Sequence, residues 1–91
     1  MKEEEVYDSL KKKLEEQFTW PQVYMFKFII PSDNQKLAMV EALFGSEAIL
    51  VNRQSKNNKF ISVTAKEMML SPTEIIEVYK KAEKIEGIIS L

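Results

Sequence analysis

Residues 23–30 read VYMFKFII, and this stretch decides the fold because it is rich in β-branched and aromatic residues, which favour a strand. Successive side chains of a strand point to opposite faces of its sheet. One face would carry Tyr24, Phe26, Phe28 and Ile30, and the other Val23, Met25, Lys27 and Ile29. The first set is almost entirely aromatic, so we predict that it faces the core.

Turn and helix signals follow this strand at regular intervals. Pro31 ends it, and Ser32 with Gln35 predicts a capping box for a helix that closes at Gly45. Residues 48–54 and 59–67 are expected to form two strands joined by the polar turn 55–58, whose asparagines tolerate left-handed backbone. The final elements are a helix that starts at Ser71-Pro72-Thr73-Glu74 and ends at Gly87, and a closing strand over 88–91.

The segment before the first strand reads as a separate leader. Val6, Leu10 and Leu14 recur at i, i+4 and i+8, which predicts an N-terminal amphipathic helix with one narrow apolar stripe. We therefore divide the chain into a leader helix with its linker, residues 1–20, and a domain over residues 21–91. The domain order β-α-β-β-α-β predicts an α+β ferredoxin-like plait, with two helices on one face of a four-stranded antiparallel sheet.

Such a plait leaves the opposite face of its sheet bare. Lys27, Ser62 and Thr64 are expected there together with apolar residues that form an interaction surface, namely Val23, Met25, Ile29, Phe60 and Ile88. An apolar patch of this kind indicates a binding surface. We expect the tethered leader to cover it with Val6, Leu10 and Leu14, and the alternatives are a second copy in a homodimer, a protein partner or a ligand.

Composition narrows the function classes. The 91 residues are enough for one core, and 45% hydrophobic with 30% charged residues is typical of a folded protein. The chain contains no cysteine and no histidine, which removes disulfides, thiolate nucleophiles, zinc fingers and imidazole catalysis. The carboxylates fall mostly on helix faces. We therefore expect no metal, no cofactor, no catalytic residue and no enzymatic activity.

Charge and hydropathy argue against nucleic acid and against a membrane as partners. Thirteen basic and fourteen acidic residues give a net charge of −1, so no general field attracts nucleic acid. The longest apolar run carries Lys27 and is too short to span a bilayer, and the first residues, Met-Lys-Glu-Glu-Glu, do not resemble a signal peptide. We expect a cytoplasmic protein with no membrane partner.

One basic cluster and one separate acidic residue are candidate ligand-binding positions. Arg53 is the sole arginine and stands near Ser55, Lys56 and Lys59, where its guanidinium could bind a carboxylate through two parallel hydrogen bonds. The alternatives are protection of an edge strand by positive charge and weak RNA binding by the basic hairpin. Asp33, in a strand-to-helix loop, is either a ligand-binding residue or a second option for the helix N-cap.

Three segments also carry a family resemblance: residues 26–33 (FKFIIPSD), residues 51–64 (VNRQSKNNKFISVT) and Glu77-Val78-Tyr79 before an apolar carboxyl-terminal strand. With these motifs, residues 23–91 resemble the YbeD-like family of bacterial proteins, although Asn58 stands where that family usually has glycine. The resemblance implies an ACT-like ferredoxin plait and a lipoic-acid-binding regulatory role. The expected function is a non-enzymatic regulatory module for lipoate or another carboxylate, with a protein-interaction module as the alternative and a weak RNA-binding domain as a second one.

Overall fold

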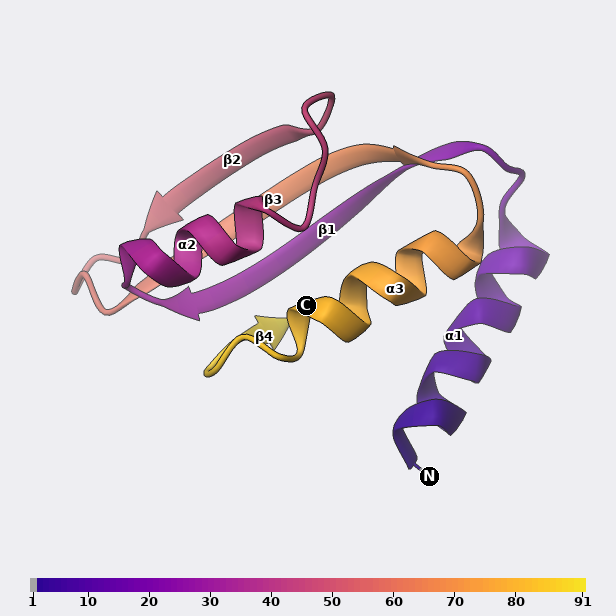
Figure 1. Cartoon of the computed structure of the whole chain (residues 1–91), viewed down its shortest axis with the longest axis horizontal. Helices are drawn as coiled ribbons and strands as arrows, with labels where there is room; N and C mark the ends of the chain where they lie inside the picture. Colours follow the sequence, from indigo (N-terminus) through magenta and orange to yellow (C-terminus); the bar gives the residue numbers. More distant parts are fainter. Residues whose placement is uncertain (1) are drawn as a thin grey trace.

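A computed structural model describes residues 2–91, with side chains from Glu4 onward, as a four-stranded antiparallel sheet and three helices (Figure 1). The elements in chain order are α1 Lys2–Gln17, β1 Gln22–Pro31, α2 Asn34–Glu41, β2 Ile49–Gln54, β3 Phe60–Met69, α3 Pro72–Ala82 and β4 Ile89–Ser90. The strand order across the sheet is β2-β3-β1-β4. The predicted α+β class and four-stranded antiparallel sheet are confirmed. None of the helices over residues 2–91 has the length and apolar character of a membrane span.

The alternation in β1 places the core as predicted. β1 pairs with β3 along its whole length, from Gln22 opposite Met69 to Pro31 opposite Phe60. Phe26, Phe28 and Ile30 have no exposed surface. They belong to one core cluster with buried residues of α2 and α3, so both helices cover the same face of the sheet.

The helix starts and ends are partly as predicted. α3 begins after Ser71 with Pro72 in its first turn, and Glu74 Oε1 accepts a hydrogen bond from the Leu70 backbone N–H at 2.7 Å. The helix ends at Ala82 rather than at Gly87. The chain turns earlier because Ile85 is buried in the core cluster, and this turn leads into β4 beside β1.

The capping box expected at Ser32 is wrong. Asp33 is the N-cap of α2, and its Oδ1 accepts from the N–H groups of Gln35 and Lys36 at 2.8 and 3.4 Å. The Ser32 hydroxyl instead accepts a hydrogen bond from Gln54 Nε2, which ties the start of the helix to β2. α2 also ends at Glu41, before the predicted stop.

The expected position of the leader is also wrong. α1 lies beside α3 in the helix layer and leaves the opposite face of the sheet uncovered (Figure 1). Leu14 is 4% exposed and belongs to the core cluster, whereas Val6 is 64% exposed. Beside α3, Leu14 joins an apolar core, while the open side of the sheet carries cations among its apolar side chains. Docking beside α3 therefore buries the apolar surface of Leu14 more completely than docking on the open side of the sheet would.

Candidate functional site

The sheet face that points away from α2 and α3 has no covering element among the described residues, and we call it the open sheet face. Register assigns side chains to it, because directly opposed residues of neighbouring strands point to the same side. It consists of Val23, Met25, Lys27, Ile29, Ile49, Val51, Arg53, Phe60, Ser62, Thr64, Lys66, Met68 and Ile89. Seven of its eight apolar residues keep between 44% and 64% of their accessible surface.

The structure corrects one member of the predicted interaction surface and adds five. Ile88 is half-buried against the core, and Ile89 lies opposite Ile29 on the open sheet face instead. Val23, Met25, Ile29 and Phe60 lie there as predicted. Besides Arg53, which the sequence analysis assigned to the ligand-binding cluster, the residues that it did not place on this face are Ile49, Val51, Lys66, Met68 and Ile89. Period-two alternation in residues 49–53 and 60–68 was the signal that could have identified most of them.

Three cations lie within this apolar surface, one on each of the three long strands. Arg53 of β2 lies opposite Ser62, Lys27 of β1 opposite Thr64, and Lys66 of β3 between Ile49 and Met25. The four strands place no aspartate or glutamate on this face. Among the side chains described, the sole ion pair joins Lys80 and Glu4, far from the sheet face. The open sheet face therefore combines apolar surface with unpaired positive charge.

The face is hollowed at one end. A depression of about 460 Å³ there is lined by Val23, Glu47, Ile49, Lys66, Glu67 and Met68. Glu47 comes from the loop before β2, at the rim of the sheet. Phe60 is the single aromatic residue on the open sheet face, because Tyr24, Phe26 and Phe28 point to the helices. The face therefore has no row of aromatic rings on which the bases of single-stranded RNA could stack.

The structure separates the predicted ligand-binding residues into different roles. Arg53 is exposed on β2, which is an edge strand as the edge-protection interpretation requires. Ser55 belongs to the turn: its hydroxyl donates to Asn57 Oδ1 at 2.8 Å and accepts from the Phe60 N–H at 3.1 Å. Lys56 and Lys59 are exposed in the same turn, which Asn58 closes with a φ of 59°.

Asp33 lies at the same end of the sheet, since the neighbouring Ser32 N–H donates to the Lys59 carbonyl at 2.9 Å. Its carboxylate caps α2, as the second interpretation of this residue predicted. The hydrogen bonds to two backbone N–H groups occupy one carboxylate oxygen. Asp33 is therefore a structural residue in this conformation, and Arg53 is the predicted ligand-binding residue that lies on the open sheet face.

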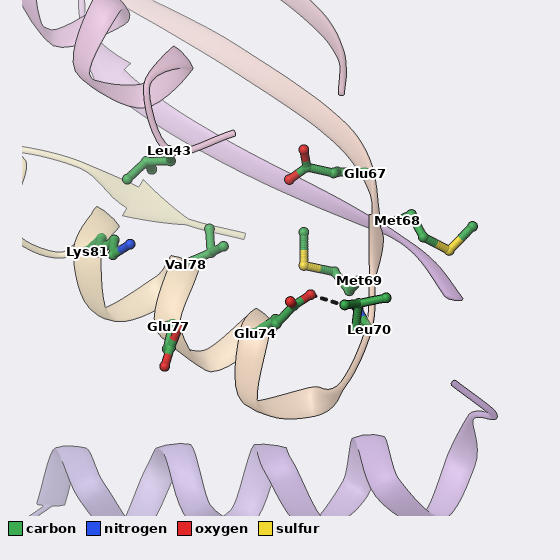
Figure 2. A pocket seen from close by; sticks show the side chains of 9 residues that line it. All are labelled: Leu43, Glu67, Met68, Met69, Leu70, Glu74, Glu77, Val78 and Lys81. Carbon is green, nitrogen blue, oxygen red and sulfur yellow. Dashed lines mark hydrogen bonds between the residues drawn. The ribbon is translucent and has the colours of Figure 1, made fainter. Parts of the chain in front are cut away.

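A second depression, of about 360 Å³, lies between the end of β3 and α3 (Figure 2). Three glutamates, Glu67, Glu74 and Glu77, line it together with Lys81. Two of these carboxylates have structural partners: Glu67 accepts from the Gly45 N–H at 2.8 Å, and Glu74 accepts from the Leu70 N–H just before α3. No group of side chains in the described part of the chain has the arrangement of a metal site.

Two partly buried tyrosines, Tyr24 and Tyr79, also have a structural explanation. The hydroxyls of Tyr24 and Tyr79 are 3.2 Å apart, beside the rings of Phe26 and Phe28. Burial raises the pKa of Tyr79 well above its ordinary range, and the hydrogen bond with Tyr24 adds to the shift. The Tyr79 hydroxyl therefore stays protonated within the aromatic core.

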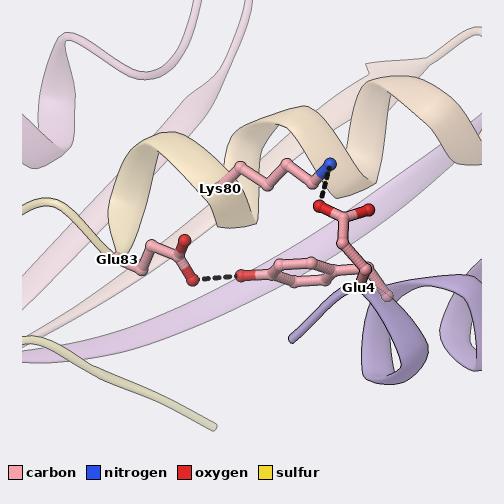
Figure 3. A network of polar contacts seen from close by, with 4 residues as sticks. Glu4, Lys80 and Glu83 are labelled. Carbon is pink, nitrogen blue, oxygen red and sulfur yellow. Dashed lines mark hydrogen bonds and ion pairs between the residues drawn. The ribbon is translucent and has the colours of Figure 1, made fainter. Parts of the chain in front are cut away.

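Polar contacts fasten the leader to α3 (Figure 3). The Tyr7 hydroxyl donates to Glu83 Oε2 at 2.6 Å, and Lys80 Nζ lies 3.2 Å from Glu4 Oε1. The same ammonium is 5.6 Å from the centre of the Tyr7 ring, within the range of a cation–π contact. These contacts are exposed, so we expect them to contribute less to docking than the apolar packing of Leu14 and the partly buried Leu10 against the core cluster. Comparison of the chain with models of known protein families, with curated proteins and with solved structures finds no significant match.

Proposed function

We propose that the chain is a non-enzymatic interaction module of the cytoplasm, and that its open sheet face binds another protein. The observation that carries the proposal is the combination of exposed apolar side chains on all four strands with three cations and no strand carboxylate. Contiguous apolar patches of this kind mark interaction sites on folded proteins. Interface cores also require flat, desolvated surface, and side chains such as Met25 and Met68 adapt their shape to a partner.

The fold that we propose for this module is a ferredoxin-like plait of the ACT-like kind preceded by a leader helix. The order β-α-β-β-α-β after α1 supports it, as does the antiparallel sheet with β1 and β3 in the centre. The resemblance to the YbeD-like family remains a prediction that rests on the sequence motifs. A regulatory role is the part of that prediction that an exposed binding face favours most.

A site-specific crosslinking experiment tests the proposed interaction. A photoreactive amino acid replaces Met25 on the open sheet face, and in a matched control it replaces Lys84, which is exposed in the turn after α3. We expect a discrete protein adduct from position 25 in the native cells and none from position 84. The adduct should disappear when Val51 is also replaced by aspartate, which disrupts the same face. Absence of an adduct from position 25 would contradict the proposal.

A small carboxylate, such as lipoate or an amino acid, is the second candidate ligand, and the position of Arg53 favours it. Arg53 lies opposite Ser62 in a row that continues through Ile29 to Ile89, so a carboxylate bound there would have its apolar part on aliphatic side chains. Because only a guanidinium binds a carboxylate in a bidentate manner, Arg53→Lys should weaken this ligand although the charge is kept. Calorimetric titration of lipoate and a panel of amino acids into both proteins tests this, and binding that is equal in the two would reject the carboxylate site.

A further inference from the structure

The apolar residues of the open sheet face form two clusters separated along the strands. Ile29, Phe60 and Ile89 form the first, near the β2–β3 turn, and Val23, Met25, Ile49 and Met68 form the second, at the opposite end. The eighth apolar residue, Val51, lies between the two clusters, in the row of Thr64 and Lys27. Ile29 and Met25 are four residues apart on β1, which corresponds to about 14 Å in a strand. About nine residues of an α-helix cover the same distance. A helix of three turns or more would therefore contact both clusters.

A helix is also the element that completes this architecture. α2 and α3 already cover the other face of the sheet, and an exposed sheet face is buried in proteins by a helix or by another sheet. A partner strand would instead pair with the free edge of β2, because its hydrogen bonds are made in the plane of the sheet. The side-chain surface is therefore suited to a helix.

The chain itself does not supply this helix in the conformation described. α1 is amphipathic, but Leu14 of its apolar stripe is buried in the core cluster and Tyr7 is hydrogen-bonded to Glu83 of the segment after α3. A second copy is also unsuitable as the occupant. Face-to-face packing about a two-fold axis would bury Lys27, which lies on a central strand, between two sheets that carry the same cations. Like charges in a desolvated interface oppose association.

Charge then specifies the partner. Lys27, Arg53 and Lys66 lie on three strands among the apolar residues. The sole carboxylate of the four strands, Glu67, is on the other face by register, and together with Glu47 it borders the depression beside Lys66. We infer that the open sheet face binds an amphipathic helix of a partner protein, with glutamate or aspartate on both sides of its apolar stripe. This inference rests on the proposed interaction function and adds the structure and charge of the partner.

Two synthetic 18-residue helical peptides provide the test. Both carry leucines at i, i+3, i+4, i+7 and i+11, but glutamates flank the stripe in one and lysines in the other. We expect the glutamate peptide to bind the full chain at least tenfold more tightly than the lysine peptide in a fluorescence-anisotropy titration. Its binding should weaken with added salt. In NMR spectra it should shift the amides of β1 and β3 more than those of α1 and α3.

Charge-reversal variants connect this binding to the face. Lys27→Glu and Lys66→Glu should each weaken the glutamate peptide by tenfold or more. Lys84→Glu, which makes the same charge change in the turn after α3, should change the affinity less than twofold. Two variants on different strands keep the test valid if one of them does not fold, which circular dichroism would reveal.

Three results would overturn the inference: equal affinity for the two peptides, no binding of either at millimolar concentration, or shifts confined to the edge amides of β2. The crosslinking experiment separates this failure from that of the proposed function. An adduct from position 25 together with any of these results leaves an interaction module whose partner is not an acidic helix. The same results without an adduct reject both proposals.

Discussion

Replacement of Leu14 by alanine tests where the leader docks and how much it contributes to stability. Leu14 is 4% exposed and contacts the core cluster, so the substitution removes a buried side chain and leaves a cavity. Leucine-to-alanine changes at buried sites cost about 2–5 kcal/mol. Leu14 comes from a helix that packs on the domain beside α3, so we expect a loss of about 2–3 kcal/mol, at the lower end of that range. Helix propensity does not contribute to the loss because alanine and leucine are both strong helix formers.

Val6→Ala is the matched control on the same apolar stripe. Val6 keeps 64% of its surface exposed, so its truncation should cost less than about 0.5 kcal/mol. The assay is equilibrium unfolding of the full chain in urea. With a slope of about 1 kcal/mol per molar urea, the midpoint should fall by about 2–3 M for Leu14→Ala and by less than about 0.5 M for Val6→Ala. Small and equal shifts would refute docking through Leu14 and indicate a leader that does not stabilise the domain.

Substitutions at four further positions, Asp33, Gly45, Tyr79 and Gly87, test the local structure. Asp33→Ala should lower the free energy of unfolding by about 1 kcal/mol through loss of the α2 cap, while Asp33→Asn should be nearly neutral; equal losses in urea unfolding would contradict the capping role. Gly87→Ala should destabilise by more than about 1 kcal/mol, because φ is 82° and a Cβ would lie 2.8 Å from the Pro31 ring. At Gly45 an added Cβ would contact only the flexible Glu67 carboxylate, so Gly45→Ala should lower the melting temperature less than Gly87→Ala does. A larger loss from Gly45→Ala than from Gly87→Ala would reject this account. Because the pKa of Tyr79 is raised in the folded state, stability should be complete below pH 10, the ordinary tyrosine value, and fall above it as the unfolded chain loses the proton. Tyr79→Phe should reduce that alkaline loss, and an unchanged pH profile of unfolding would exclude Tyr79 as its source.

Local patterns were sufficient for much of the secondary structure. Alternation in residues 23–30 predicted the buried face of β1, because side-chain direction in a strand depends on the backbone alone. The start of α3 at Ser71–Glu74 and the left-handed Asn58 follow from the same kind of local preference. It was harder to predict which of two neighbouring residues would cap a helix. Ser32 and Asp33 both suit an N-cap, and the choice between them depends on Gln54, which is distant in sequence and binds Ser32.

The candidate site, too, has some features that the sequence predicted and others that only the tertiary structure decided. The sequence alone placed Val23, Met25, Lys27 and Ile29 on one face of a strand, and it indicated that this face has no covering helix in the domain. Only the tertiary structure decided that α1 docks on α3, that Ile89 rather than Ile88 joins the open face, and that Arg53 and Lys66 lie with Lys27. The physical reason is that the periodicity of an element specifies which side chains share a face. What each face contacts depends on the free energy of burial against elements elsewhere in the chain, which a local pattern does not contain.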